Sequence, residues 1–176
     1  MDPILVGYFP KRLFPPPPYL AEAGVKEIGS VSRCIASGPD GGIDERKNNE
    51  WGCFSDPDTA WSTVPPELRA GYRLYAYEVY PLKFYDGAAH HDEIAILEVT
   101  PLDGTFTAVG WDAVSRSTEQ DFECSPLSCN HMVEHFTVNE YCLVGLHEAQ
   151  TLAAIAERWG CEPGPYVVVN VWLRDA

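Results

Sequence analysis

The sequence predicts one α+β domain spanning residues 1–176, in which a mixed β-sheet of about five to seven strands carries one main helix. Three observations support this fold class. Hydrophobic residues make up 45% of the 176-residue chain, which is enough to build a core at this length. Several short segments are rich in β-branched and aromatic residues, as strands are. Residues 146–159 show a clear helical repeat of apolar side chains.

Residues 1–18 are predicted to form an extended N-terminal arm. Residues 4–9 are mostly apolar and typical of a short strand. The four prolines at 15–18 favour polyproline II geometry, so we expect a stiff connector to the body of the domain. One helical turn is expected at residues 19–23, and a weaker strand at residues 25–35.

A short helix is predicted to begin at Pro57. Asp56 can accept hydrogen bonds from the first free backbone N–H groups, and proline suits the first helical position. Asp58 then lies at the positive end of the helix dipole. The helix must be short, because Pro65 and Pro66 follow.

The strongest strand pattern lies in the middle of the chain. Residues 72–81 are largely apolar on both faces, which is typical of a central strand covered on both sides. Residues 93–100 and 105–111 flank Asp103-Gly104, a hairpin-type turn. We therefore expect these two segments to pair as antiparallel strands.

The C-terminal third predicts a strand–helix–strand unit. Residues 138–144 and 166–173 are apolar and contain β-branched side chains, as buried strands do. The helix at 146–159 lies between them, and Gly160 is suited to end it. Such a unit joins parallel strands through a right-handed crossover, which would make the sheet mixed.

Charge is the clearest global signal. The chain has 12 Lys and Arg residues against 26 Asp and Glu residues, a formal net charge of −14. Such a surface repels nucleic acid and anionic membranes, and no apolar run approaches the ~20 residues of a membrane span. The N-terminus lacks the pattern of a secretory signal, so we expect a cytoplasmic protein. The same charge would attract and steer a basic protein partner.

The chain contains six cysteines, and a chain of this length does not need disulfides in order to fold. Three of them precede apolar residues, so we expect reduced and mostly buried thiols. The six are Cys34, Cys53, Cys124, Cys129, Cys142 and Cys161.

Residues 122–135 contain the densest group of reactive side chains, with two thiols, two imidazoles and two carboxylates. Zinc prefers four nitrogen or sulfur ligands at tetrahedral angles, so the predicted ligands are Cys124, Cys129, His131 and His135. The last five residues also match H-x-x-E-H, the pattern of inverted zincin peptidases, a family that the chain resembles nowhere else.

An alternative reading of the same segment is a cysteine nucleophile. Cys124 or Cys129 would attack, with His90, His91 or His131 as the base. A reactive thiolate needs a cation or a helix N-terminus nearby to lower its pKa.

Aromatic residues on the predicted strands suggest a possible site for a small molecule. A pocket, if formed, is expected between Tyr75, Tyr77 and Trp111. Aromatic side chains at strand spacing are more often part of a core. Buried tyrosine hydroxyls in either case need hydrogen-bond partners.

Residues 122–130 and 163–168 resemble stretches of uncharacterised bacterial proteins, and this resemblance implies no particular activity. We predict a non-enzymatic acidic binding protein, of inhibitor, immunity or regulatory type, that recognises a basic protein partner. Phosphate-binding loops and a nucleophile elbow are absent from the sequence. No cofactor is expected other than zinc, which the predicted ligands could bind. The alternatives are a zinc- or cysteine-centred enzyme using residues 124–135 and a small-molecule sensor. The oligomeric state is left open.

Overall fold

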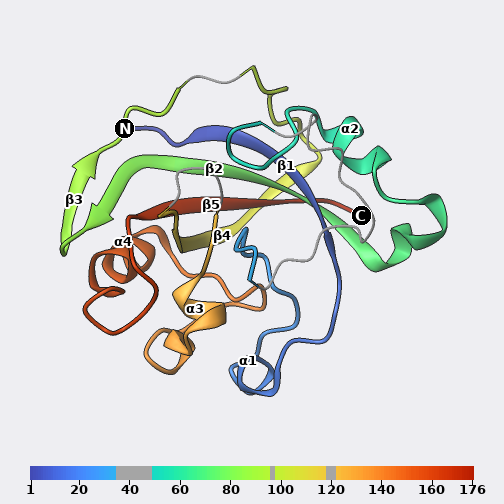
Figure 1. The fold of residues 1–176 in the computed structure, drawn as a ribbon. Helices are drawn as coiled ribbons and strands as arrows, with labels where there is room; N and C mark the ends of the chain where they lie inside the picture. The colour runs from blue at the N-terminus through green and yellow to red at the C-terminus, as the bar shows by residue number, and fades with distance from the viewer. Residues whose placement is uncertain (35–48, 96–97, 118–121) are drawn as a thin grey trace.

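The computed structural model describes residues 1–34, 49–95, 98–117 and 122–176 (Figure 1). It contains a five-stranded antiparallel sheet and a few short helices, which confirms the α+β class. The strand order is β1-β2-β5-β4, and β3 pairs with the far end of β2. The strands are β1 (Ile4–Arg12), β2 (Tyr72–Tyr85), β3 (Ala88–His91), β4 (Phe106–Ser115) and β5 (Tyr166–Arg174).

The helical segments are short and lie around the sheet. In Figure 1, α1, α3 and α4 lie together below the strands, whereas α2 lies beside β1. In the described part of the chain, the α-helices are α1 (Pro18–Glu22), α2 (Pro57–Ser62), α3 (Pro126–Cys129) and α4 (Leu146–Ile155), and the 3-10 helices are η2 (Pro66–Gly71) and η3 (Met132–Glu134). None of these helices has the length and hydrophobicity needed to cross a membrane.

Strand β2 is central, as its two apolar faces predict. It pairs with β1 on one side and with β5 on the other, and both pairings are antiparallel. One face of the sheet buries Tyr75, Tyr77 and Val169 under Trp51 and other residues. Elsewhere in the core, the apolar side of α4 packs on β5.

Strand β1 is longer than the sequence predicts, because it continues through Pro10 to Arg12. Proline cannot donate to a strand ladder, so it is tolerated on an edge strand. Strand β1 lies at an edge of the sheet, where Pro10 faces Leu74 of β2. The predicted helical turn after the prolines is present as α1, and α2 begins at Pro57 as expected.

The sheet is antiparallel and not mixed, which corrects the predicted strand–helix–strand unit. Residues 138–144 do not form a strand, because Asn139 folds them into a turn. Its Oδ1 accepts hydrogen bonds from the backbone N–H groups of Tyr141 at 2.9 Å and Leu143 at 3.1 Å. A single bridge between Val144 and Trp111 remains, and α4 ends at Ile155 rather than at residue 159.

Two other predicted strands also differ. The described part of residues 93–100 contains no strand, and β4 pairs with β5 instead. Residues 25–34 form an irregular segment that lies beside the Asn139 turn, where Gly29 N donates to Tyr141 O at 2.9 Å. Residue 35 and residues 96–97 of these predicted strands lie outside the described residues.

Candidate metal centre

Three cysteines from two distant parts of the chain converge at the end of β4. The sulfur atoms of Cys34, Cys124 and Cys129 all lie within 4.8 Å of one another. The Sγ atoms of Cys34 and Cys124 are 2.7 Å apart. Cys124 is buried, Cys129 is half-buried and Cys34 is exposed, so the cluster opens to solvent on the Cys34 side.

Backbone hydrogen bonds hold Cys34 beside Cys124, although the two are 90 residues apart in the sequence. Arg33 N donates to Phe122 O at 3.3 Å, and Cys34 N donates to Glu123 O at 3.4 Å. The hydroxyl of Ser32 also donates to Glu123 O at 2.7 Å. These bonds make residues 32–34 and 122–124 run side by side.

Strand β4 anchors the second of these segments to the sheet. Ser115 N donates to Cys124 O at 2.9 Å, and Glu123 N donates to Ser115 O at 2.8 Å. The hydroxyl of Ser115 also accepts a hydrogen bond from Cys124 N at 3.0 Å. Cys124 therefore has a fixed backbone at the end of a core strand.

Helix α3 positions the third thiol. Ser125 has extended dihedral angles and its side chain accepts from Ser128 N, while Pro126 occupies the first helical position. This Ser-Pro start is a local signal for a helical turn. Cys129 is the last residue of the turn, and its Sγ lies 3.5 Å from Ser32 Oγ and 3.8 Å from Ser128 Oγ.

The surroundings of Cys124 and Cys129 favour the protonated forms of these two thiols. Burial raises the pKa of Cys124, and the adjacent Cys34 thiol raises it further. Burial also raises the pKa of Cys129, although hydrogen bonds from Ser32 and Ser128 partly oppose the shift. Among the described residues, no cationic group is a cause of either shift. A raised pKa disfavours the thiolate form of either cysteine, and a bound metal ion can displace the protons.

The donor set suits a thiophilic metal ion. Zinc–sulfur bonds of about 2.3 Å at tetrahedral angles place two sulfur atoms about 3.8 Å apart. The three sulfur atoms, all within 4.8 Å of one another, are close to that arrangement. Cys34 and Cys124 would have to separate by about 1 Å, a movement that the exposed Cys34 side chain can supply by rotation.

The two histidines predicted as ligands lie elsewhere. His131 has a positive φ of 59° and its ring stacks on Tyr19 at 4.0 Å between centroids. His135 packs edge-on against Trp159 at 4.9 Å. The segment forms the single 3-10 turn η3, so the helical spacing of H-x-x-E-H is not realised. Within the described ranges, the group of converging metal ligands contains neither histidine.

Cys34 was missed as a ligand by sequence reasoning. Spacing arguments work within one segment, and Cys34 reaches Cys124 only through the pairing of two loops. The nearest sequence signal is the cysteine count itself, because Cys34 is one of six.

The predicted aromatic residues lie on two faces of the sheet. Tyr77 faces Val171 of β5, whereas Trp111 faces the next residue, Asn170, and successive strand residues point to opposite faces. Tyr75 and Tyr77 are fully buried, with their hydroxyls donating to Glu27 Oε1 and to Gly29 O. Trp111 instead packs edge-on against Tyr80.

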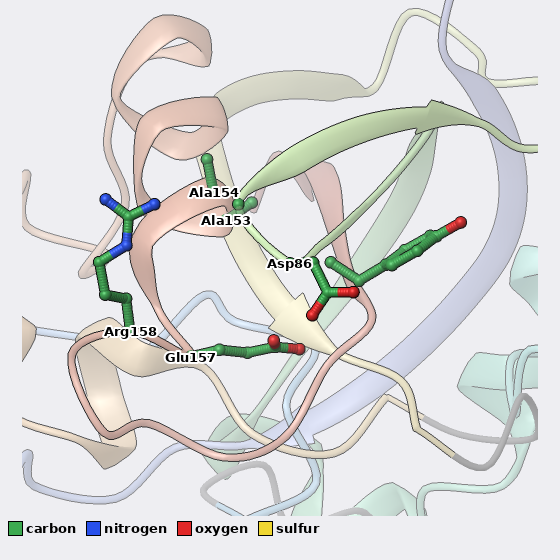
Figure 2. Close-up of a pocket in the computed structure, with 7 residues that line it drawn as sticks. Asp86, Ala153, Ala154, Glu157 and Arg158 are labelled. Carbon is green, nitrogen blue, oxygen red and sulfur yellow. The ribbon is translucent and has the colours of Figure 1, made fainter.

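The structure also has pockets away from the cysteine cluster. One, of about 300 Å³, lies between the β2–β3 turn and α4. Figure 2 shows the Asp86 and Glu157 carboxylates on neighbouring sides of it, and Glu157 Oε1 also accepts from Gly164 N at 2.6 Å. Another, of about 580 Å³, is lined by Trp61, Arg69 and Arg174 among others.

Comparison of the chain with protein-family models, with curated proteins and with solved structures found no match. The cluster offers three sulfur ligands, two of them on segments tied together by backbone hydrogen bonds, with Cys34 on the exposed side.

Proposed function

We propose that this chain is a zinc-binding protein in which Cys34, Cys124 and Cys129 supply three thiolate ligands. The observation that carries the proposal is the convergence of three thiols from two segments. Thiolates favour zinc, copper(I) and iron–sulfur clusters. Iron–sulfur clusters generally use four cysteines, which makes zinc the better match for three.

Three protein ligands leave one position of a tetrahedral zinc ion open. The open position would face solvent beside Cys34, the exposed member of the cluster. A water molecule or a side chain of a partner could occupy it. The residues of the chain would hold the ion, tie residues 32–34 to the end of β4 and present the open position at the surface.

Metal content tests this proposal directly. The full chain is purified under reducing conditions without chelator, after growth with added zinc, and its metals are measured by elemental mass spectrometry. We expect about one zinc ion per chain. A chelator should then lower the melting temperature by roughly 5–10 °C, because the ion binds only the folded state.

Matched variants identify the ligands. Cys129→Ser should lose the zinc, whereas Cys161→Ser, outside the cluster, should keep it. His131→Ala and His135→Ala should also keep it, because their rings pack on Tyr19 and Trp159. Loss of zinc in both histidine variants would instead support the four-ligand site predicted from the sequence. Absence of zinc from the reduced wild-type protein, even after reconstitution, would sink the proposal.

A second candidate function is recognition of a basic protein partner. The net charge is −14, and Asp112 is the one buried acidic side chain among the described residues. Lys11 and Arg116 are buried as well, so they do not offset the outward-facing carboxylates at the surface. Such a surface attracts basic proteins over long range.

Salt dependence tests this second function. Partners are captured by cross-linking at about 50 mM salt, identified, purified and returned to the pure chain for affinity measurement. We expect a basic partner whose affinity falls at least tenfold at about 500 mM salt, because salt screens surface charges. Failure to recover a partner at low salt, or an affinity that salt does not change, argues against it.

A further inference from the structure

We propose that Cys34 and Cys124 form a reversible disulfide, and that its formation releases the metal ion from the cysteine cluster. The inference rests on the proposed zinc site, because its consequence is the loss of two of the three sulfur ligands. The proposed disulfide is a modification site within the zinc site. Zinc binding would then depend on the thiol–disulfide balance of the surroundings.

The position of the two sulfur atoms carries the inference. Their separation of 2.7 Å lies between the ~2.05 Å of a disulfide and the ~3.8 Å expected for two thiolates on one zinc ion. Small movements in opposite directions therefore reach either state. Cys129 is not part of the proposed disulfide, because its Sγ also contacts the hydroxyls of Ser32 and Ser128.

The backbone supports the same pair. Residues 32–34 are hydrogen-bonded to residues 122–124, with Cys34 N donating to the carbonyl of Glu123, the neighbour of Cys124. This pairing does not depend on the thiols. The two cysteines therefore stay beside each other whether they are reduced, oxidised or bound to a metal ion.

Exposure of the two thiols sets the order of the reaction. Cys34 is exposed and Cys124 is buried, so a small disulfide of the glutathione type reaches Cys34 first. The Cys34 thiolate attacks one sulfur of that disulfide, which forms a mixed disulfide and releases one small thiolate that takes a proton from water.

Cys124 completes the exchange. Its thiolate leaves the metal ion and attacks Cys34 Sγ, and the second half of the small disulfide departs as a thiolate that takes a proton from water. The two protein sulfurs lose two electrons in total, and the small disulfide gains them. Cys129 remains as the single thiolate of the cluster, which is too few ligands to retain zinc.

The experiment follows zinc and disulfide in the same sample. Zinc-loaded full chain is incubated with mixtures of oxidised and reduced glutathione, and released zinc is measured with a chromophoric chelator. Free thiols are then alkylated and the linked peptides are mapped by mass spectrometry. We expect about one zinc ion released per Cys34–Cys124 disulfide, and recovery of zinc binding after dithiothreitol reduction.

Three variants separate the steps. Cys161→Ser should behave as the wild type does. Cys129→Ser should bind no zinc and still form the Cys34–Cys124 disulfide, because the backbone pairing is intact. Cys34→Ser should form no disulfide with Cys124 under the same glutathione mixtures.

The outcomes distinguish the two proposals. A zinc-bound protein that resists oxidation, or one that links Cys129 to either other cysteine, overturns this inference and leaves the zinc site standing. Disulfide formation without zinc release also overturns it. If the reduced chain binds no zinc, the zinc site and the switch fall together, and the peptide map then shows whether the cysteine pair itself was correct.

Discussion

Lys11 and Asp112 are both buried, and Ser30 joins them. Lys11 Nζ donates to the carbonyl oxygens of Ser30 and Ile28, the latter at 2.6 Å. The hydroxyl of Ser30 donates to Asp112 Oδ2 at 2.5 Å. Asp112 Oδ1 accepts in turn from the hydroxyl of Ser125, which caps α3, at 2.9 Å. A buried polar network thus runs from β1 to the helix that carries Cys129.

In the wild-type protein, the free energy of unfolding should rise as the pH increases above 7, and replacing Lys11 with methionine should remove this rise. Burial lowers the pKa of Lys11 from 10.5 to about 7, although Asp112 partly opposes the shift. Between these values the unfolded chain binds more protons, so the free energy of unfolding rises with pH. The slope approaches about 1.4 kcal/mol per pH unit. Urea denaturation of wild type and Lys11→Met between about pH 7 and pH 8.5 measures it.

Lys26→Met is the matched control, because Lys26 is 78% exposed and pairs with Glu140 at the surface. It should keep the wild-type dependence on pH. The argument for a buried, neutral lysine fails if Lys11→Met shows the same slope as the wild type over this range.

Asp112→Asn should remove a pH dependence of opposite sign. Burial raises the pKa of Asp112 to about 6, although hydrogen bonds from Ser30 and Ser125 limit the rise. Between its ordinary value near 3.8 and about 6, the folded state binds more protons, so stability falls as pH increases. This group alone would account for about 2–3 kcal/mol. Denaturant titrations at about pH 4 and pH 6.5 measure it.

Asp58→Asn serves as the control, because the Asp58 side chain is 87% exposed. Asp58→Asn should keep the fall in stability that the wild type shows between the two pH values. The same fall in Asp112→Asn would mean that Asp112 titrates as it does in the unfolded chain.

Local signals in the sequence predict the parts of the fold that depend on residues close together in the chain. Asp56 and Pro57 predict the start of α2, because capping needs only residues within one turn. The apolar pattern of residues 72–81 predicts the central position of β2. The segment at 138–144 misleads, because one side chain, Asn139, occupies the N–H groups that a strand would use.

The cysteine cluster could be predicted only in part. Cys124 and Cys129 lie close in sequence, and residues 125–129 carry their own helix start. Cys34 joins them through pairing across 90 residues, which no spacing rule reveals. His131 and His135 fit a helical metal motif by spacing, but His131 is itself left-handed and the residues between the two form a 3-10 turn.

Asp56→Ala should destabilise the protein by about 1 kcal/mol, because it removes the cap of α2. Asp56 Oδ1 accepts from Thr59 N at 2.8 Å, and Oδ2 accepts from the Thr100 hydroxyl at 3.1 Å. Chemical denaturation near pH 7 measures the loss. Asp58→Ala, in the first turn of the same helix, should change stability by less than half as much. Equal effects would mean that helix-dipole charge rather than capping stabilises this end.

Gly7→Ala should destabilise the protein severely, because Gly7 occupies a β-bulge that excludes a side chain. The register between β1 and β2 shifts at this residue, and its φ is +139°. An added Cβ would lie 2.5 Å from Phe54 O and 2.7 Å from Cys53 Cβ. Phe54 is also bonded to the neighbouring Tyr8 through a backbone bridge, so it cannot move away without breaking that pairing.

Gly24→Ala separates the backbone effect from the steric one. Gly24 has a φ of +87° and nothing within 4 Å of an added Cβ. Its replacement should cost about 1 kcal/mol from backbone strain alone. Gly7→Ala should cost several times more, because the clash adds to that strain. Urea denaturation of both variants gives the comparison, and similar losses would show that the contact with Phe54 yields easily.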